Sequence, residues 1–292
     1  MIHGFLMRKD IYTDKGVKKA MREEIKFSII MVCLNAGRRL QDTLESILKQ
    51  NYADYEVIIK DGGSKDSSLA CVSENERVHL YREQDTGIYD AMNQAIRYAK
   101  GEYLLFLNAG DLFYNEHVLT EIASVIEKKK LENTSFAGVV YGNMYHSGLG
   151  TVVYASPHIN DFTCYRNVPC HQTCFYHRSL FEVRGYDVKY NVRADYEHFL
   201  WCYYERKADF VYTETIVACY EGGGYSETAE NRKRSAMQHK EIVKRYMGTA
   251  KYIKYRLILL ATLAPLRSRL AENDKFSKVY NDLKTWIYKK KG

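Results

Sequence analysis

The segment from Gly101 to Asp111 constrains the fold of this chain more than any other. An apolar run, Tyr103 to Leu107, ends abruptly at the polar sequence Asn-Ala-Gly-Asp, residues 108–111. Such a run is typical of a buried strand in a parallel sheet, and open α/β sheets bind ligands just beyond the carboxyl ends of their strands. Asp111 is therefore suited to hold a divalent cation, although the same residues also form a good turn that needs no ligand.

The same pattern, an apolar strand followed by polar residues, recurs earlier in the chain. Residues 26–34 and 55–59 read as strands, and residues 78–81 read as a shorter third strand. Between them, apolar residues at helical spacing predict one helix over residues 40–48 and another over residues 88–99. This alternation predicts an α/β fold with a mostly parallel, doubly wound sheet flanked by helices.

Polar residues stand at or near the carboxyl ends of the four predicted strands. They are Asn35, Asp61, Asp85 and Asp111. Because parallel strands end at the same edge of a sheet, we expect these side chains to share one edge. Turn formation alone is a poor explanation for four such residues, so this edge is the candidate functional site.

The composition is that of a globular protein with reduced cysteines. The chain has 292 residues, of which 46% are hydrophobic and 27% are charged. Its seven cysteines form no Cys-x-x-Cys pair and no secretory signal precedes them, which predicts a cytoplasmic protein. The cysteines and histidines between Cys164 and His177 do not have the spacing of common structural zinc sites.

Positive charge is concentrated near the C-terminus. The net charge is +7, and from Lys244 onward 13 Lys and Arg stand against 3 Asp and Glu. An apolar run there, residues 257–264, is shorter than the roughly 20 residues that cross a bilayer. The segment fits an anchor on an anionic membrane surface, and it also fits a terminal helix packed on the domain with a solvated basic face. No nucleic-acid motif accompanies the charge, so nucleic acid is not an expected partner.

With these residues in order, the chain resembles the family 2 glycosyltransferases, which have the GT-A fold. The likeness runs from about Lys26 to about Ile242. The motifs that carry it are Ser28 to Asn35, Lys60 to Asp66, Asp85 to Asn93, Gly101 to Asp111, His171-Gln172, Ala194 to Glu197 and Gly222 to Ser226. The residues of the third and fourth motifs are most similar to those of bacterial enzymes that build exopolysaccharide or O-antigen repeats, including transferases of the colanic-acid type.

The resemblance implies an inverting glycosyltransferase. Such an enzyme moves a sugar from a nucleotide-diphosphate sugar to a hydroxyl of a saccharide or lipid-linked saccharide in cell-surface polysaccharide synthesis. It implies a divalent cation, Mg²⁺ or Mn²⁺, that neutralises the leaving diphosphate. It also implies a base, since an acceptor hydroxyl is a weak nucleophile at neutral pH. A membrane-bound C-terminal segment would place the enzyme at the inner face of the cell membrane.

On the donor side, the resemblance assigns three polar residues. Asp61 matches the carboxylate that accepts hydrogen bonds from the nucleobase, Asp85 matches a second donor-pocket carboxylate, and Asn35 matches the polar residue of the first strand. Leu34 stands where a stacking Tyr is often found, so the identity of the base is less well defined than the binding of a nucleotide.

The metal position departs from the family pattern. Asp111 matches the last carboxylate of the Asp-x-Asp motif and is assigned the metal, but the earlier carboxylate is replaced by Ala109. Asn108 is expected to compensate by contacting the ribose or a metal-bound water. The missing carboxylate puts strict dependence on a metal in question.

Across the cleft, the resemblance assigns Asp195 as the general base. It precedes a helical pattern, so the helix N-terminus would favour its ionised form, and the alternative role is an ordinary helix N-cap. His171 and Gln172 are expected to line the acceptor side, although a lone His more often has a structural role.

The predicted organisation has four parts. Residues 1–25 form an N-terminal extension, residues 26–135 the nucleotide-sugar-binding half, residues 136–228 the acceptor-binding half, and residues 229–292 a basic C-terminal helical segment.

Two other functions remain open on the sequence alone. A non-catalytic sugar- or membrane-binding scaffold of transferase descent is suggested by Ala109 and Ala194, which replace carboxylates of the family motifs. A sugar-phosphate nucleotidyltransferase shares the alternating layout, but it would open with a Gly-rich basic loop that residues 35–39 match poorly.

Overall fold

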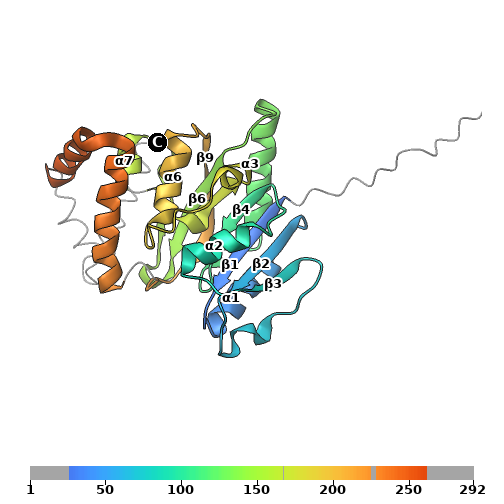
Figure 1. Ribbon diagram of the computed structural model, residues 1–292. Helices are drawn as coiled ribbons and strands as arrows, with labels where there is room; N and C mark the ends of the chain where they lie inside the picture. The colour runs from blue at the N-terminus through green and yellow to red at the C-terminus, as the bar shows by residue number, and fades with distance from the viewer. Residues whose placement is uncertain (1–25, 167, 225–227, 262–292) are drawn as a thin grey trace, which may run out of the picture.

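Four parallel strands form one side of a mixed β-sheet (Figure 1). They are β1 (Phe27–Cys33), β2 (Tyr55–Asp61), β3 (Val78–Arg82) and β4 (Tyr103–Phe106), in the order β3-β2-β1-β4. The predicted strands and their parallel pairing are confirmed. The computed structural model describes residues 26–166, 168–224 and 228–261.

The second half of the chain extends the same sheet with mixed pairing. Strand β8 (Cys174–His177) pairs antiparallel with both β4 and β6 (Val139–His146), and β9 (Phe210–Tyr220) runs parallel to β6. The short strands β5 (Leu112–Phe113) and β7 (Thr151–Val153) pair antiparallel with β9 and β6. Both predicted halves, 26–135 and 136–228, therefore contribute to one sheet.

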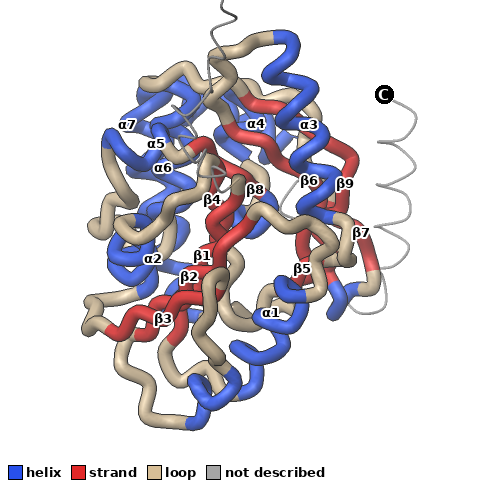
Figure 2. The backbone as a smooth tube through the Cα atoms, turned by 90° about the vertical axis from the view of Figure 1, so that its right-hand side faces the viewer, coloured by secondary structure: helices blue, strands red, loops and turns tan. Residues whose placement is uncertain are grey.

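Helices cover both faces of the sheet, as Figure 2 shows with α1 and α3 on one side of the strands and α2, α5 and α6 on the other. The helices are α1 (Arg38–Leu48), α2 (Ile88–Ile96), α3 (Val118–Glu132), α4 (Asp161–Arg166), α5 (Ser179–Val183), α6 (Ala194–Tyr204) and α7 (Ala229–Ala261), with short 3-10 turns η1 (Ser67–Cys71), η2 (Ser147–Leu149) and η3 (His171–Thr173).

Strand β1 shows why two cores form. Phe27, Ile29 and Met31 pack into the core beneath α1 and α3, whereas Ile30 and Val32 pack into the core beneath α2, α5, α6 and α7. Successive side chains of a strand point to opposite faces, so a strand with helices on both sides is apolar throughout. This is the physical basis of the continuous apolar runs in the sequence.

Helix ends differ slightly from the sequence prediction. Leu48, the last residue of α1, is half exposed, and α2 ends at Ile96 rather than at residue 99. Asp66 caps η1, since its carboxylate accepts a hydrogen bond from the backbone N–H of Ser68.

Helix α7 packs its first part against α6 and then turns at Gly248, whose φ of 79° and ψ of 165° interrupt the helix. The fully buried Glu197 of α6 binds both the Arg184 guanidinium, at 2.6 Å, and the Tyr246 hydroxyl of α7. None of the helices in the described ranges is both long and apolar enough to cross a membrane. The predicted extension 1–25, residues 262–292 of the basic segment, and Tyr225 and Ser226 lie outside the described residues.

Candidate active site

The predicted polar residues lie at or after the carboxyl ends of β1, β2, β3 and β4, and these ends share one edge of the sheet because the strands are parallel. Hydrogen bonds join the neighbouring strand ends. The backbone N–H of Asn35 donates to Ser64 Oγ at 2.8 Å, and the side chain of Asn35 accepts from the backbone N–H of Lys65 at 2.9 Å. Asn35 thus connects the loops after β1 and β2, while its side chain remains exposed.

The carboxylate of Asp61 is buried and fully engaged within the chain. It accepts hydrogen bonds from the backbone N–H groups of Gly63 and Ser64, and Arg82 Nε lies 3.4 Å from its Oδ2. Burial alone would raise the pKa of Asp61, but the hydrogen bonds from Ser64 and Gly63 and the charge of Arg82 lower it. Asp61 is therefore ionised and shapes the loop that follows β2.

Asp85 is held by a lysine from inside the sheet. Lys60 Nζ, with a fully buried side chain, lies 2.5 Å from Asp85 Oδ2 and donates to the carbonyl of Glu83 at 2.7 Å. A Cβ atom on Gly62 would lie 2.5 Å from the same Asp85 oxygen. A glycine at position 62 is what allows the loop after β2 to approach Asp85.

Asp195 lies at the centre of a second cluster, formed by residues from three elements and the loop after β4. His171 Nδ1, from η3, lies 3.3 Å from Asp195 Oδ2, and the Tyr89 hydroxyl of α2 donates to Asp195 Oδ1 at 2.8 Å. Asn108 Nδ2, just after β4, lies 3.3 Å from His171 Nε2. We call the residues Asn108, His171, Asp195 and Tyr89 the Asp195 cluster.

Asp195 does not occupy the N-cap position of α6. Asp195 is the second residue of α6, and the N-cap position belongs to Arg193, which makes no capping hydrogen bond through its side chain. The carboxylate instead turns toward His171 and Tyr89 and remains about one quarter exposed, at 26%.

The two partners in this contact favour each other's charged form. Burial would raise the pKa of Asp195, but hydrogen bonding and the positive charge of His171, together with the Tyr89 hydroxyl, lower it. Burial would lower the pKa of His171, but the hydrogen bond to Asp195 and the charges of Asp195 and Asp111 raise it. Asp195 is thus an ionised carboxylate that reaches solvent beside a histidine able to carry a proton.

Asp111 lies near this cluster in a drier environment. Asp111 is only 7% exposed, and this burial raises its pKa from 3.8 to about 6. The charge of His171 and a hydrogen bond from Gln172 lower the pKa but do not cancel the effect of burial. The nearby Asn108 Oδ1 is buried and has no hydrogen-bond partner within the described residues. A carboxylate and an unsatisfied amide oxygen therefore occur together on the loop after β4.

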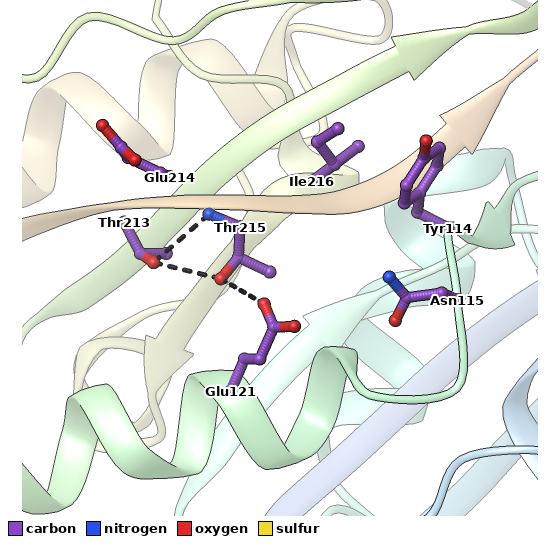
Figure 3. Close-up of a pocket in the computed structure, with 7 residues that line it drawn as sticks. All are labelled: Tyr114, Asn115, Glu121, Thr213, Glu214, Thr215 and Ile216. Carbon is purple, nitrogen blue, oxygen red and sulfur yellow. Dashed lines mark hydrogen bonds between the residues drawn. The ribbon is translucent and has the colours of Figure 1, made fainter.

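A separate hollow of about 400 Å³ lies between α3 and β9, as Figure 3 shows. It is lined by Tyr114, Asn115, Glu121, Thr213, Glu214, Thr215 and Ile216. None of the predicted site residues lines it. Three of its polar side chains are engaged with one another, since Thr215 Oγ1 donates to Glu121 at 2.7 Å and lies 3.1 Å from Thr213 Oγ1. The candidate active site is the polar sheet edge rather than this hollow.

Comparison with known proteins identifies the family. The sequence model of Glycosyl transferase family 2 matches residues 28–191, which include the polar sheet edge and His171. The chain belongs to glycosyl transferase family 2. The family match favours glycosyl transfer over the nucleotidyltransferase alternative, and the protein is a glycosyltransferase.

Relatives of this family 2 glycosyltransferase include a PGL/p-HBAD biosynthesis glycosyltransferase of Mycobacterium bovis. It is 33% identical over 214 residues, which cover 71% of this chain and 81% of the relative. The glycosyltransferase GlyG of Streptococcus pneumoniae is 34% identical over 124 residues, or 41% of this chain and 39% of the relative.

Solved structures of low sequence identity share the fold. S. aureus TarS (residues 1–349) superposes with a TM-score of 0.61 at 16% identity, covering 81% of this chain and 73% of that chain. The Pyrobaculum calidifontis mannosyltransferase PcManGT, solved with GDP-Man and Mn²⁺, has a TM-score of 0.54 at 16% identity and covers 87% and 83% of the two chains. The family 2 glycosyltransferase therefore has the GT-A-type fold that the resemblance implied.

The residues after β4 offer a divalent cation few protein ligands. No group of three or more His, Cys, Asp or Glu suited to a metal occurs among the described residues. Asp111 and the unpartnered Asn108 Oδ1 nevertheless supply hard oxygen ligands of the kind that Mg²⁺ and Mn²⁺ prefer. Mg²⁺ sites often use one or two carboxylates together with substrate phosphates, so this pair fits a cation carried largely by a diphosphate.

Three contacts were not anticipated from the sequence. Tyr89 binds Asp195, Lys60 binds Asp85, and Arg82 binds Asp61. Tyr89 and Lys60 both lie within motifs that carry the resemblance, but neither motif names the contact. The partner of the buried Lys60 lies 25 residues farther along the chain.

Proposed function

We propose that this glycosyltransferase inverts the anomeric carbon of a nucleotide-diphosphate sugar, with Asp195 as the general base. The observation that carries the proposal is the series of contacts from Asn108 through His171 to Asp195. This series joins the polar edge of the parallel strands to the first turn of α6. These contacts support a single site that takes both donor and acceptor.

The base would act directly on the acceptor. An acceptor hydroxyl oxygen attacks the anomeric carbon from the face opposite the diphosphate, the carbon–oxygen bond to the diphosphate breaks, and the hydroxyl proton passes to Asp195. The lowered pKa of Asp195 keeps it ionised and ready to accept that proton. His171 and Tyr89 orient the carboxylate, since each contacts a different oxygen.

Residues 26–135 are proposed to bind the donor through Asn35, Asp61 and Asp85. TarS has been solved with UDP and with UDP-GlcNAc, and PcManGT with GDP-Man, which supports a nucleotide-sugar donor for a chain of the same fold. Asp61 already binds Arg82, so a nucleobase that contacts Asp61 must displace or share that guanidinium.

A divalent cation, Mg²⁺ or Mn²⁺, is proposed to be held by Asp111 with Asn108 nearby. When bound, it would neutralise charge on the leaving diphosphate. The position of Ala109 leaves the protein with one carboxylate there, so the diphosphate itself would supply most of the remaining ligands.

Residues 136–228 are proposed to bind the acceptor, with His171 and Gln172 on that side of the site. The mycobacterial relative is named a PGL/p-HBAD biosynthesis glycosyltransferase, which supports a biosynthetic role for glycosyl transfer by this chain. We place the acceptor in the class of saccharides or lipid-linked saccharides, and the synthesis of cell-surface polysaccharide as the process.

The test is to incubate the full chain with a panel of nucleotide-diphosphate sugars and Mn²⁺, and to measure release of the nucleoside diphosphate. The best donor is then supplied with saccharide and lipid-linked acceptors, and the anomeric configuration of the product is read by NMR. Inverted configuration supports the proposal, and retained configuration overturns the mechanism. Neither hydrolysis nor transfer with any donor would favour the scaffold alternative.

A further inference from the structure

The part of α7 after Gly248 has one face against the protein. Its side chains Tyr252 and Tyr255 pack beside Tyr165 of α4, with ring centroids 6.2 Å and 5.4 Å from that ring. Figure 1 shows α7 as two helical segments that meet at an angle, at the side of the molecule away from β3.

The opposite face of this segment carries an exposed apolar stripe. Ile253, Leu257 and Leu260 are 50%, 60% and 51% exposed. Their spacing of four and then three residues places them along one side of the helix. Three large aliphatic side chains side by side in water are unusual on a surface helix, which normally exposes its polar face. We call these three residues the α7 stripe.

Basic residues border the α7 stripe. Residues 244–261 contain five Lys and Arg and no Asp or Glu. Arg245 and Lys251 are paired with carboxylates of the domain. Lys254 and Arg256, at helical positions on the two sides of the stripe, form no ion pair with any residue in the described ranges.

We infer that the α7 stripe docks on an anionic phospholipid surface. Ile253, Leu257 and Leu260 would enter the boundary between headgroups and acyl chains, and Lys254 and Arg256 would contact lipid phosphates. An apolar stripe bordered by cations, on a helix too polar to span a bilayer, is the pattern of interfacial membrane helices.

The positive charge beside the α7 stripe argues against two other occupants, a second copy of the chain and residues 262–292. A second copy of the chain would bring the same cations against Lys254 and Arg256 if the two stripes paired by symmetry. Residues 262–292 hold eight Lys and Arg against three Asp and Glu, so they too are positively charged. A phospholipid surface supplies apolar contact and negative charge together.

The docking segment is continuous with the helix that supports the active site. The first part of α7 binds the loop before Asp195, since Gln238 accepts from the Val192 N–H at 3.1 Å and Arg193 Nε donates to Ser235 Oγ at 2.7 Å. Docking would thus hold the enzyme where a lipid-linked acceptor resides. This last step rests on the proposed function, whereas membrane binding does not.

The test uses the full chain and flotation with vesicles, without donor or acceptor. Vesicles of phosphatidylcholine with phosphatidylglycerol are compared with vesicles of phosphatidylcholine alone. We expect binding to the anionic vesicles that weakens at high salt. The variant I253S/L257S/L260S should lower the bound fraction by about fivefold or more, and K254Q/R256Q should weaken the preference for anionic lipid.

The control is Met237→Ser. It removes a large apolar side chain, 66% exposed, from the part of α7 before Gly248 and outside the α7 stripe. It should bind vesicles like the unmodified protein. Thermal melting and donor hydrolysis confirm that each variant is folded. Absence of vesicle binding, or unchanged binding by the triple variant, overturns the inference. A dimer in solution that the triple variant abolishes would show that the stripe is a contact between copies, and would overturn it as well.

Discussion

His171 Nδ1 lies 3.3 Å from Oδ2 of Asp195, and this contact joins two parts of the chain that follow different strands of the sheet. His171 begins η3, directly before β8, and Asp195 is the second residue of α6. Because burial opposes charge on both groups while the contact favours it, the pair depends on both members.

Asp195→Asn should lower the rate of sugar transfer by at least about 100-fold while leaving nucleotide affinity nearly unchanged. The amide keeps the size of the side chain but cannot accept the acceptor proton. Single-turnover transfer and calorimetric titration with the nucleoside diphosphate measure the two quantities. Asp209→Asn, an exposed carboxylate, is the matched control and should leave transfer unchanged. Equal loss of transfer and of nucleotide affinity would mean that Asp195 has a structural role.

Removal of His171 should shift the pH dependence of transfer. His171 lowers the pKa of Asp195, so in His171→Ala the remaining burial raises that pKa. The base must be ionised, so activity on the acidic side should be lost at a higher pH than in the unmodified protein. The profile of kcat/KM against pH measures this.

Two variants sharpen that experiment. His171→Gln keeps a hydrogen-bond donor but no charge and should give a smaller shift, while the exposed His158→Ala should give none. A lower rate with an unmoved acidic limb would show that His171 supports only the local fold.

The parallel part of the sheet could be predicted because each of its strands is marked by a pattern of neighbouring residues. The run from Tyr103 to Leu107 is apolar at every position, which a strand buried on both faces requires, and the polar break after it marks the strand end. The antiparallel strand β8 has only four residues, and its partners, β4 and β6, lie far away in the sequence. No local pattern marks it.

The contacts within the Asp195 cluster could not be predicted either, because they join residues that are far apart in the sequence. Tyr89 and Asp195 are 106 residues apart, and Asn108 and His171 are 63 apart. Each of these residues also has an ordinary explanation as a turn, core or cap residue. The polar strand ends suggested one edge, but only the packing of α2 and α6 on the same face of the sheet brings Tyr89 to Asp195.

Asp111→Asn should stabilise the fold near neutral pH while weakening donor binding that depends on Mn²⁺. Burial raises the pKa of Asp111 from 3.8 to about 6, so the folded state holds a proton that the unfolded state releases between those values. Ionised Asp111 therefore costs stability on the order of 3 kcal/mol above about pH 6, and this cost disappears below about pH 4.

Urea unfolding at neutral and acidic pH measures this gain. The variant should be more stable than the unmodified protein near pH 7 and equal to it near pH 4. Asp209→Asn, at an exposed position, should show no gain. A loss of stability at neutral pH would show that the Asp111 carboxylate is held by structural partners, and an unchanged Mn²⁺ titration would refute its role at the metal.

Lys60→Met should destabilise the protein by about 3–5 kcal/mol, because it leaves the partly buried Asp85 without its cation. The double variant K60M/D85N should regain much of that loss, since no uncompensated charge remains. Donor affinity should stay low in the double variant if Asp85 binds the donor. Urea unfolding and nucleotide titration of both single variants and the double variant measure these effects separately.

Lys65→Met, an exposed lysine in the same loop, is the control and should change stability little. If the two single-variant losses simply add, the 2.5 Å contact between Lys60 and Asp85 contributes no coupling, and Asp85 must be positioned by the backbone alone.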